Sequence, residues 1–392
     1  MSTSKNSRSA PNIPRPLSKP ITIRDVAART GMSKSAVSLA LRRSPLLRAE
    51  TGDRIRAVAE AMGWRPNPSV ASWMAHRRAA AGAKVCGQQI IFVNVFPDLQ
   101  FWRQRPSQTR FVAGVERRAK ALGYEFEELW LAAPGMTTRR LDQILCARAV
   151  EGLVIGSAAT SHAHLSLSWE RFAAVAQGFS LLNPPLSRAA NDYSHTTMST
   201  LRELRRLGYA RVGLLLQPEH DARSRAFWSS AYQRFQQHLE PHNRLQIFPG
   251  HDSDDVALAA WLKSERPDVV VTLNILFRTT LGRLGISIPA DLGFACLDLH
   301  PGYEHLYSEI TECAGFDHHV EFAGEAAVDL LAAQLNANER GVPQHPRTLL
   351  TQGKWVLGKT VRRVGPVVPL LGLPKRTSVV ESEFAAEMNG LE

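Results

Sequence analysis

The chain has 392 residues, 44% of them hydrophobic, which is enough for two or three domains and excludes disorder throughout. Its net charge of +11 lies in one segment, because residues 1–78 hold 15 Lys/Arg against 4 Asp/Glu, whereas the remainder holds 32 of each. A basic module on a neutral body is typical of nucleic-acid binding, and the alternative is a basic tail that only aids solubility.

Membrane, exported and metal-binding proteins each have signals that this sequence lacks. No apolar run approaches the roughly 18 residues that cross a bilayer, and the polar N-terminus does not resemble a secretory signal. The histidines at 162, 164, 318 and 319 lack partners at metal-ligand spacing, and the cysteines form no CxxC pair. We therefore expect a cytoplasmic protein with no metal or other cofactor and with reduced thiols at Cys86, Cys146, Cys296 and Cys313.

The first elements in chain order predict a helix-turn-helix. Residues 1–20 carry four prolines among serines and basic residues, which is typical of a flexible arm. Thr22 can cap a first helix with Asp25 at its third position, and Gly31 can end it. Ser33 can then cap a second helix. Two short helices joined by a tight turn predict a motif whose second helix enters the major groove of DNA.

The second helix has one apolar face and one polar face. Its expected buried residues are Ala36, Val37, Ala40 and Leu41. Its outward residues, which are candidates for contact with DNA, are Lys34, Ser35, Ser38, Leu39 and Arg42. A third helix is expected over residues 49–62. Beyond it, Asn67 can cap a short helix that begins at Pro68, and such a short helix should be marginal in isolation.

After residue 88, short apolar runs alternate with amphipathic segments. Strands are expected at 90–95, 153–155, 172–176, 212–216, 269–273 and 293–297, and helices at 111–122, 198–207, 226–238, 254–263 and 322–336. This alternation predicts parallel sheets covered by helices. Because the strands outnumber those of one usual sheet, we expect an α/β body of two doubly wound parallel-sheet subdomains with a cleft between them.

These patterns divide the chain into five parts. They are a flexible basic arm at 1–20, an all-α helix-turn-helix domain at 21–65, a short helix and linker at 66–84, an α/β body at 85–362, and a frayed acidic tail at 363–392.

The first eighty residues resemble the lactose-repressor (LacI/GalR) family of transcription regulators. The similar stretches are I-T-I-R-D-V-A-A-R-T-G-M-S-K-S-A-V-S-L-A-L and G-W-R-P-N-P, and the body adds R-L-G-Y-A-R-V-G-L-L and I-P-A-D-L-G-F-A-C-L-D. The resemblance covers about residues 21–360. It implies a body like the periplasmic binding proteins, a homodimer and a pseudopalindromic double-stranded DNA operator. It leaves open whether dimers assemble into tetramers.

By position in this family, Lys34, Ser35 and Leu39 would read bases. Leu39 departs from the arginine of many relatives, and a leucine packs on a thymine methyl rather than donating to guanine. The alternative for Lys34 is a contact with phosphate only. Further DNA contacts are expected from Thr22, Ser33, Ser38, Arg42 and Asn67.

The family also inserts an apolar wedge from its hinge helix into the minor groove. Counted from Pro66, this wedge falls on Trp73, and the alternative is Met74.

The resemblance places a small-molecule effector in the body cleft. The corresponding positions are Asn94, Phe96, Arg225, Asn274, Asp298 and His318, with Arg223 as an alternative to Arg225. Their donors and acceptors suit hydroxyl groups, and Trp228 or Phe96 could stack on a sugar face. The expected function is a ligand-responsive repressor that acts on the nucleoid and senses a sugar or sugar derivative. The alternatives are an activator of the same architecture, a sugar-binding transport protein, or an enzyme, although the motifs GxGxxG, GxxxxGK[ST] and GxSxG are absent.

Overall fold

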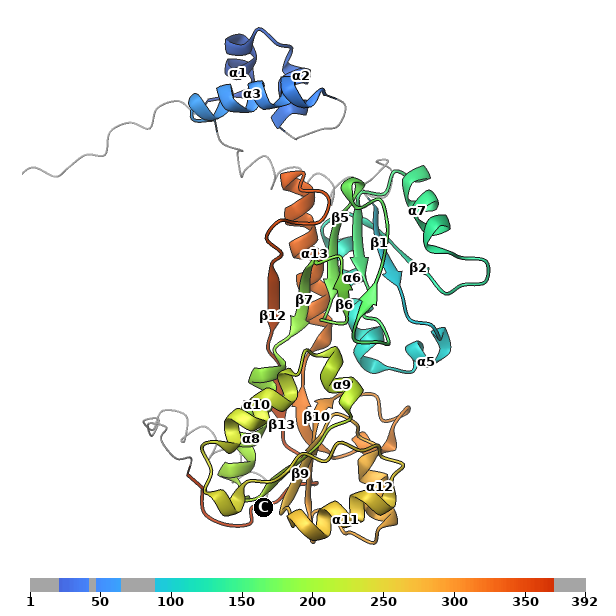
Figure 1. Cartoon of the computed structure of the whole chain (residues 1–392), viewed down its shortest axis with the longest axis vertical. Coiled ribbons are helices and arrows are strands. Elements are labelled where there is room, and N and C mark those ends of the chain that lie inside the picture. The colour runs from blue at the N-terminus through green and yellow to red at the C-terminus, as the bar shows by residue number, and fades with distance from the viewer. Residues whose placement is uncertain (1–20, 42–46, 65–88, 370–392) are drawn as a thin grey trace, which may run out of the picture. The chain divides into compact units, whose positions relative to one another are not determined.

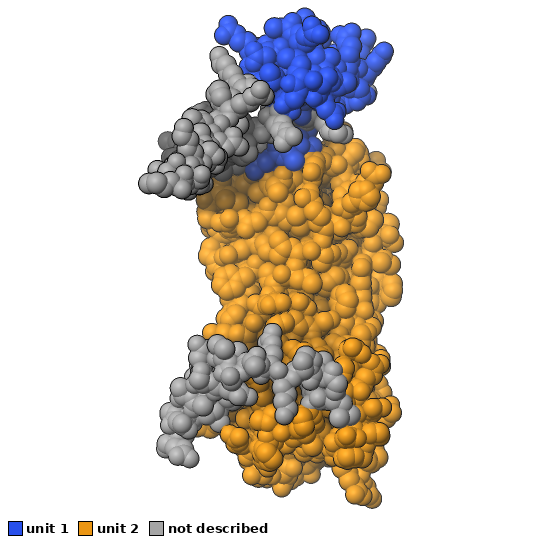
Figure 2. Space-filling view, turned by 90° about the vertical axis from the view of Figure 1, so that its left-hand side faces the viewer, with its two compact units in different colours: residues 1–75, 336–338 blue, residues 76–335, 339–392 orange. Residues whose placement is uncertain are grey.

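The computed structural model describes residues 21–41, 47–64 and 89–369. The chain forms two compact units, residues 1–75 with 336–338, and residues 76–335 with 339–392 (Figure 2). We refer to them as the helical unit and the body and describe each by itself.

The helical unit contains three short helices, α1 (Ile23–Thr30), α2 (Lys34–Leu41) and α3 (Ala49–Ala61). The capping predictions are confirmed. The Thr22 amide donates to the Asp25 carboxylate at 2.8 Å, and Ser33 Oγ accepts from the Ala36 amide at 3.1 Å. Gly31 ends α1 with a φ of 68°. Val26, Val37 and Ile55 form the centre of a small core between the three helices.

The first sheet of the body is wholly parallel, with strand order β12-β7-β5-β3-β1-β2 (Figure 1). Its strands are β1 (Gln89–Asn94), β2 (Glu125–Trp130), β3 (Gly152–Ile155), β5 (Ala173–Gln177), β7 (Ser187–Asn191) and β12 (Thr348–Thr351). Successive residues of β1 enter opposite cores, as the pleat of a strand requires. One core is shared with α6 (Pro106–Ala121) and α13 (Val320–Ala337), and the other with α7 (Thr138–Ala147).

The helices α6 and α13 approach each other closely. A Cβ atom added to Gly114 would lie 1.9 Å from the Glu321 carbonyl oxygen, and one added to Gly324 would lie 2.1 Å from the Phe111 carbonyl oxygen. Larger residues would therefore push the two helices apart, and with them the residues at their ends.

The second sheet has strand order β13-β11-β10-β9-β8 and is parallel except for β13. Its strands are β8 (Val212–Leu215), β9 (Val269–Thr272), β10 (Gly293–Leu299), β11 (Ala314–Asp317) and β13 (Lys354–Val356). One face packs on α8 (Tyr193–Arg206) and α10 (Phe227–Gln236), and the other on α11 (Asp255–Glu265) and α12 (Phe277–Arg283). Smaller elements are β4 (Ala163–His164), β6 (Leu181–Asn183), α5 (Leu99–Arg103) and α9 (Pro218–Arg223).

The chain passes between the two sheets three times, after β7, after β11 and between β12 and β13. One side chain joins all three crossings, because the Asn191 amide donates to the His318 carbonyl and to Thr351 Oγ1, each at 3.2 Å. Gly353 allows the close approach, since an added Cβ would lie 2.0 Å from the Asp317 carbonyl oxygen. These crossings form the hinge between the subdomains.

The prediction of two parallel-sheet subdomains is confirmed, and each predicted strand ends within two residues of an observed one. Three strands of the two sheets were missed because they do not read as apolar runs: β2 alternates with glutamates, β7 is S-R-A-A-N, and β11 is the short A-G-F-D. The two C-terminal strands, β12 and β13, were missed as well. The tail predicted to fray from residue 363 is held as far as residue 369, because Arg205 donates to the carbonyls of Val368 and Pro369.

Candidate functional site

The helical unit exposes polar and charged residues at the start of α2. Lys34 and Ser35 are exposed, whereas Ser38 and Leu39 are partly covered. Thr22 and Ser33 are exposed and cap the first two helices. Among the described residues of this unit, the other exposed cations are Arg24, Arg29, Arg48 and Arg54. The remaining predicted DNA contacts, Arg42, Asn67, Trp73 and Met74, lie outside the described residues.

The body contains a cleft of about 460 Å³ between the two sheets. Its walls are built where strands end: Gln177 and Asn191 end β5 and β7, and Gln217 and Asn274 follow β8 and β9. The carboxyl ends of parallel strands are the usual place for ligands in sheets of this type. The volume lies in the range of small-molecule sites.

Amide and hydroxyl side chains contribute to the wall formed by the first sheet. Gln177 Oε1 accepts from the Ser157 amide at 3.1 Å, and Ser157 Oγ donates to Gln108 Oε1 at 3.0 Å. On the opposite wall, Asp252 accepts from the side chains of Asn274 at 3.0 Å and Gln217 at 3.4 Å. Both walls therefore present ordered donors and acceptors.

Aromatic rings line the same space. Trp228 lies 4.6 Å from Tyr193 between ring centroids, and Phe179 lies 6.1 Å from Tyr193. All three line the cleft, and so does Phe101, which is 45% exposed. Burial raises the pKa of Tyr193 to about 12, so this phenol stays neutral and can donate a hydrogen bond.

A carboxylate at the end of β10 is held ionised at the inner end of the cleft. Asp298 Oδ1 lies 3.2 Å from His300 Nε2 and 3.9 Å from His318 Nε2. Burial alone favours the neutral acid, but His300, His318 and Arg110 outweigh it, and the pKa of Asp298 lies well below its ordinary value. Asp298 is thus an acceptor at neutral pH.

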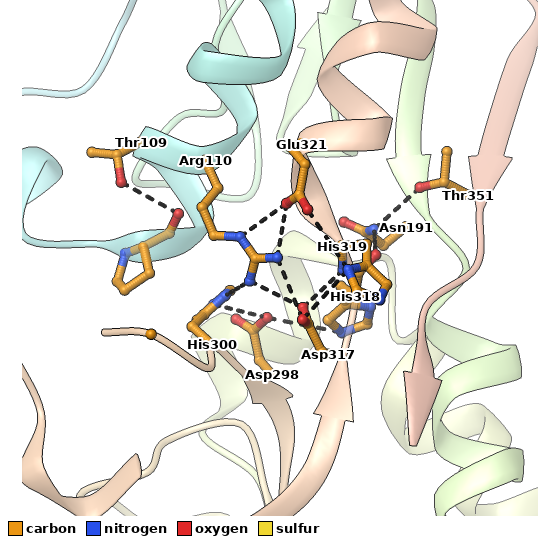
Figure 3. A network of polar contacts seen from close by, with 12 residues as sticks. Thr109, Arg110, Asn191, Asp298, His300, Asp317, His318, His319, Glu321 and Thr351 are labelled. Atoms are coloured by element: carbon orange, nitrogen blue, oxygen red, sulfur yellow. Dashed lines mark hydrogen bonds and ion pairs between the residues drawn. The ribbon is translucent and has the colours of Figure 1, made fainter. Parts of the chain in front are cut away.

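Arg110 of α6 connects the two subdomains at the hinge (Figure 3). Its Nη1 donates to Asp317 at 3.0 Å, and its Nε donates to Glu321 at 2.9 Å. Asp317 ends β11 and Glu321 lies in the first turn of α13, so one guanidinium binds both sides of a crossing. Despite its burial, the pKa of Arg110 is raised by Asp317 and Glu321.

The same guanidinium determines how His300 is protonated. Arg110 Nη1 lies 3.1 Å from His300 Nδ1, and arginine can only donate. Nδ1 must therefore accept, which leaves the proton of the neutral ring on Nε2, facing Asp298. Arg110, His300 and Asp298 form a continuous chain from the first subdomain to the cleft carboxylate.

The structure brings together only some of the predicted effector residues. Asn274, Asp298 and Trp228 line the cleft, and His318 lies behind Asp298. Asn94 and Phe96 are not among the lining residues, because the Asn94 side chain bonds Glu128 and the Phe96 amide, and Phe96 enters the core. Arg225 is exposed and lies 5.6 Å from the Phe179 ring, whereas Arg223 lines the cleft.

Several cleft and hinge residues had no sequence signal. Arg105, Gln108 and Arg110 belong to the start of a helix and to no recognisable motif, and Asp252 lies in a loop. Gln177 ends β5 and Gln217 follows β8, so the rule that ligands bind at the carboxyl ends of strands would have found them had those ends been examined residue by residue.

Among the described residues, no helix has the length and apolar character needed to cross a membrane. In the same residues, His, Cys, Asp and Glu nowhere gather in a group of three that could hold a metal ion.

Solved structures of three transcription regulators share the fold. A CelR–cellobiose complex is 16% identical over 87% of this chain and 100% of that chain, with a TM-score of 0.50. A LacI family regulator of Enterococcus faecium with bound ribose is 18% identical over 71% and 100%, with a TM-score of 0.51. A transcription-regulator-like protein of Staphylococcus haemolyticus is 13% identical over 71% and 100%, with a TM-score of 0.51. No curated protein sequence matches the chain.

Two family models match the two units. Residues 22–67 match the model described as bacterial regulatory proteins, lacI family, and residues 201–361 match the periplasmic binding protein-like domain. The first match contains the capped helices α1 and α2, and the second contains one wall of the cleft with Asn274 and Asp298. The chain therefore belongs to the lacI family of bacterial regulatory proteins, which are ligand-responsive, DNA-binding transcription regulators.

Proposed function

We propose that this regulator is a repressor whose operator affinity is set by a carbohydrate bound in the body cleft. The observation that carries the proposal is the lining of the cleft. Asp298 and the Asn274, Gln177 and Gln217 amides offer acceptors and donors for hydroxyls, next to aromatic faces such as that of Trp228. Two fold relatives are named with cellobiose and ribose, which supports this class of ligand.

For DNA binding we propose a homodimer on a pseudopalindromic operator. Each helical domain, at residues 21–65, would place α2 in a major groove, with Lys34, Ser35 and Leu39 at base edges. The hinge helix and linker at 66–84 would insert Trp73 or Met74 into the minor groove. The body at 85–362 would hold the effector and the dimer contact. The operator places this activity on the nucleoid, in the cytoplasm.

We infer that the body senses its ligand without converting it. Two candidate nucleophiles that line the cleft, Ser157 and Cys296, are not activated. Ser157 Oγ bonds an amide oxygen rather than a base, and burial raises the pKa of the Cys296 thiol well above its ordinary value.

The proposal is tested in two steps. Thermal unfolding of the full chain is measured against a panel of neutral and charged sugars, because a ligand that binds the folded state raises the melting temperature. Compounds that stabilise the protein are then added to an operator obtained by binding-site selection. We expect at least one of them to weaken operator binding. A panel in which stabilising sugars leave operator affinity unchanged contradicts the proposal.

A further inference from the structure

Two arginines line the cleft without an ion pair. Arg105 precedes α6 and Arg223 ends α9, so the two come from different subdomains. The Nε atom of each is buried and has no hydrogen-bond partner among the described residues. Instead, Cζ of Arg105 lies over the Phe101 ring, 4.3 Å from its centroid. Buried polar atoms are normally hydrogen-bonded, so these two Nε atoms require an explanation.

The carboxylates of the cleft do not serve as their partners. Asp252 accepts from Gln217 and Asn274, and Asp298 faces His300. No contact of either arginine with a carboxylate within 4.0 Å occurs in the described part of the chain. The cleft thus holds acids already supplied with donors and guanidiniums without acceptors.

The two arginines and His220 repel one another. Burial lowers the pKa of Arg223 and repulsion from Arg105 lowers it further, against the opposing influence of Tyr193 and Asp298. Burial also lowers the pKa of His220, with Arg223 and Arg105 adding to the effect and Asp298 and Glu219 opposing it. The first turn of α6 has no acidic residue and lines the cleft, so its partial positive charge adds to that of the arginines.

We propose that the effector carries an anionic group, a carboxylate or a phosphate, bound between Arg105 and Arg223. Both groups match the planar donor fork of arginine. This rests on the proposed function and specifies its ligand as an acidic or phosphorylated sugar whose hydroxyls face Asp298 and Asn274. Because the two arginines belong to opposite walls, the anion favours the closed cleft, and its charge is what the closed state recognises.

Inorganic phosphate tests the anion subsite without knowledge of the effector. Binding to the full chain is followed by phosphorus NMR for the wild type, Arg105→Gln and Arg223→Gln. The control is Arg103→Gln, an exposed neighbour that is not among the cleft-lining residues. We expect a saturable site that each cleft variant weakens about ten- to hundredfold, and that Arg103→Gln leaves unchanged. Any phosphate binding to the helical unit should be the same in all variants, which distinguishes it from binding in the cleft. If Arg105→Gln and Arg223→Gln bind phosphate as the wild type does, the proposal is overturned.

Three matched sugars then identify the group. Calorimetry compares glucose, glucuronate and glucose 6-phosphate, which differ in charge on one scaffold. We expect one charged sugar to bind at least about tenfold more tightly than glucose, and Arg223→Gln to remove that preference, with Arg223→Lys intermediate. No preference for either charged form overturns the proposal. If glucose alone binds and alters operator affinity, the proposed function stands and the anion inference fails. If phosphate binds at the arginines but no sugar alters operator affinity, the proposed function fails instead.

Discussion

The first two helices of the helical unit and the crossings of the body differ in how their basic residues are exposed and paired. In the helical unit, Arg24, Arg29 and Lys34 are exposed, with no ion pair to a described residue. In the body, Arg110 is largely buried and tied to Asp317 and Glu321. Exposed unpaired cations attract a polyanion and release its counterions, whereas a buried, paired cation holds structure. Position and pairing, rather than residue type, therefore separate DNA affinity from the architecture that responds to ligand.

Deletion of residues 1–66 is the largest change we predict. Operator binding should be abolished, because the net charge of the chain lies within its first 78 residues. Fluorescence anisotropy at several salt concentrations measures the affinity and its salt slope, and circular dichroism checks that the body is folded. A truncated chain that binds DNA with the salt slope of the full chain would show that the body, too, contacts the polyanion.

Arg110→Ala should destabilise the body by about 3–5 kcal/mol, because Asp317 and Glu321 would remain buried without their partner. Arg117→Ala is the matched control on the same helix. Its ion pair with Glu325 is exposed, with a side-chain exposure of 54% for Arg117, and should contribute about 0–1 kcal/mol. Urea unfolding gives both values. Equal losses in the two variants would mean that the hinge network has no special role.

Lys34→Ala should weaken binding to the preferred operator by about 1–3 kcal/mol and relax the preference at one base pair. Binding-site selection with the variant reads out that preference. A uniform loss across all sequences would instead identify Lys34 as a phosphate contact, which the exposure of its side chain also permits.

A smaller effect on stability is expected when the pH is lowered. Burial lowers the pKa of His318 below 6.5, against the opposing influence of Asp298 and Asp317 and together with that of His300. The folded state then binds fewer protons than the unfolded state. The contribution of His318 to the free energy of unfolding is therefore complete above about pH 6.5 and is lost as the pH falls below it. The wild type should lose more stability between pH 7.5 and 5.5 than His318→Gln does. Identical losses would show that His318 does not titrate on unfolding.

The two units also differ in how far the sequence predicts them. Caps act within a few residues, so Thr22, Gly31 and Ser33 predict the helical unit correctly. The buried strands that are apolar runs, such as β1 and β9, are equally readable. The edge strand β2 and the polar strand β7 depend on distant partners, and no local pattern reveals them.

The cleft follows the same division. Asn274 and Asp298 are readable because they stand at strand ends, a position that the order of the elements determines. Arg105, Arg110 and Asp252 acquire their roles only when helices and loops from different parts of the chain meet. Arg223 lines the cleft, whereas the sequence predicted Arg225. The two positions lie two residues apart, and only the geometry of α9 distinguishes them.

Operator affinity measured with and without sugars, in the wild type and in Asp298→Ala, tests most directly whether the body cleft controls the helical unit. In the wild type, at least one sugar of the neutral and charged panel should change operator affinity by about fivefold or more. In Asp298→Ala, operator binding without sugar should persist and the response should disappear, because a ligand shifts the protein only through its different affinity for two states. An unchanged response in Asp298→Ala would contradict the account, and so would loss of DNA binding in that variant before any sugar is added.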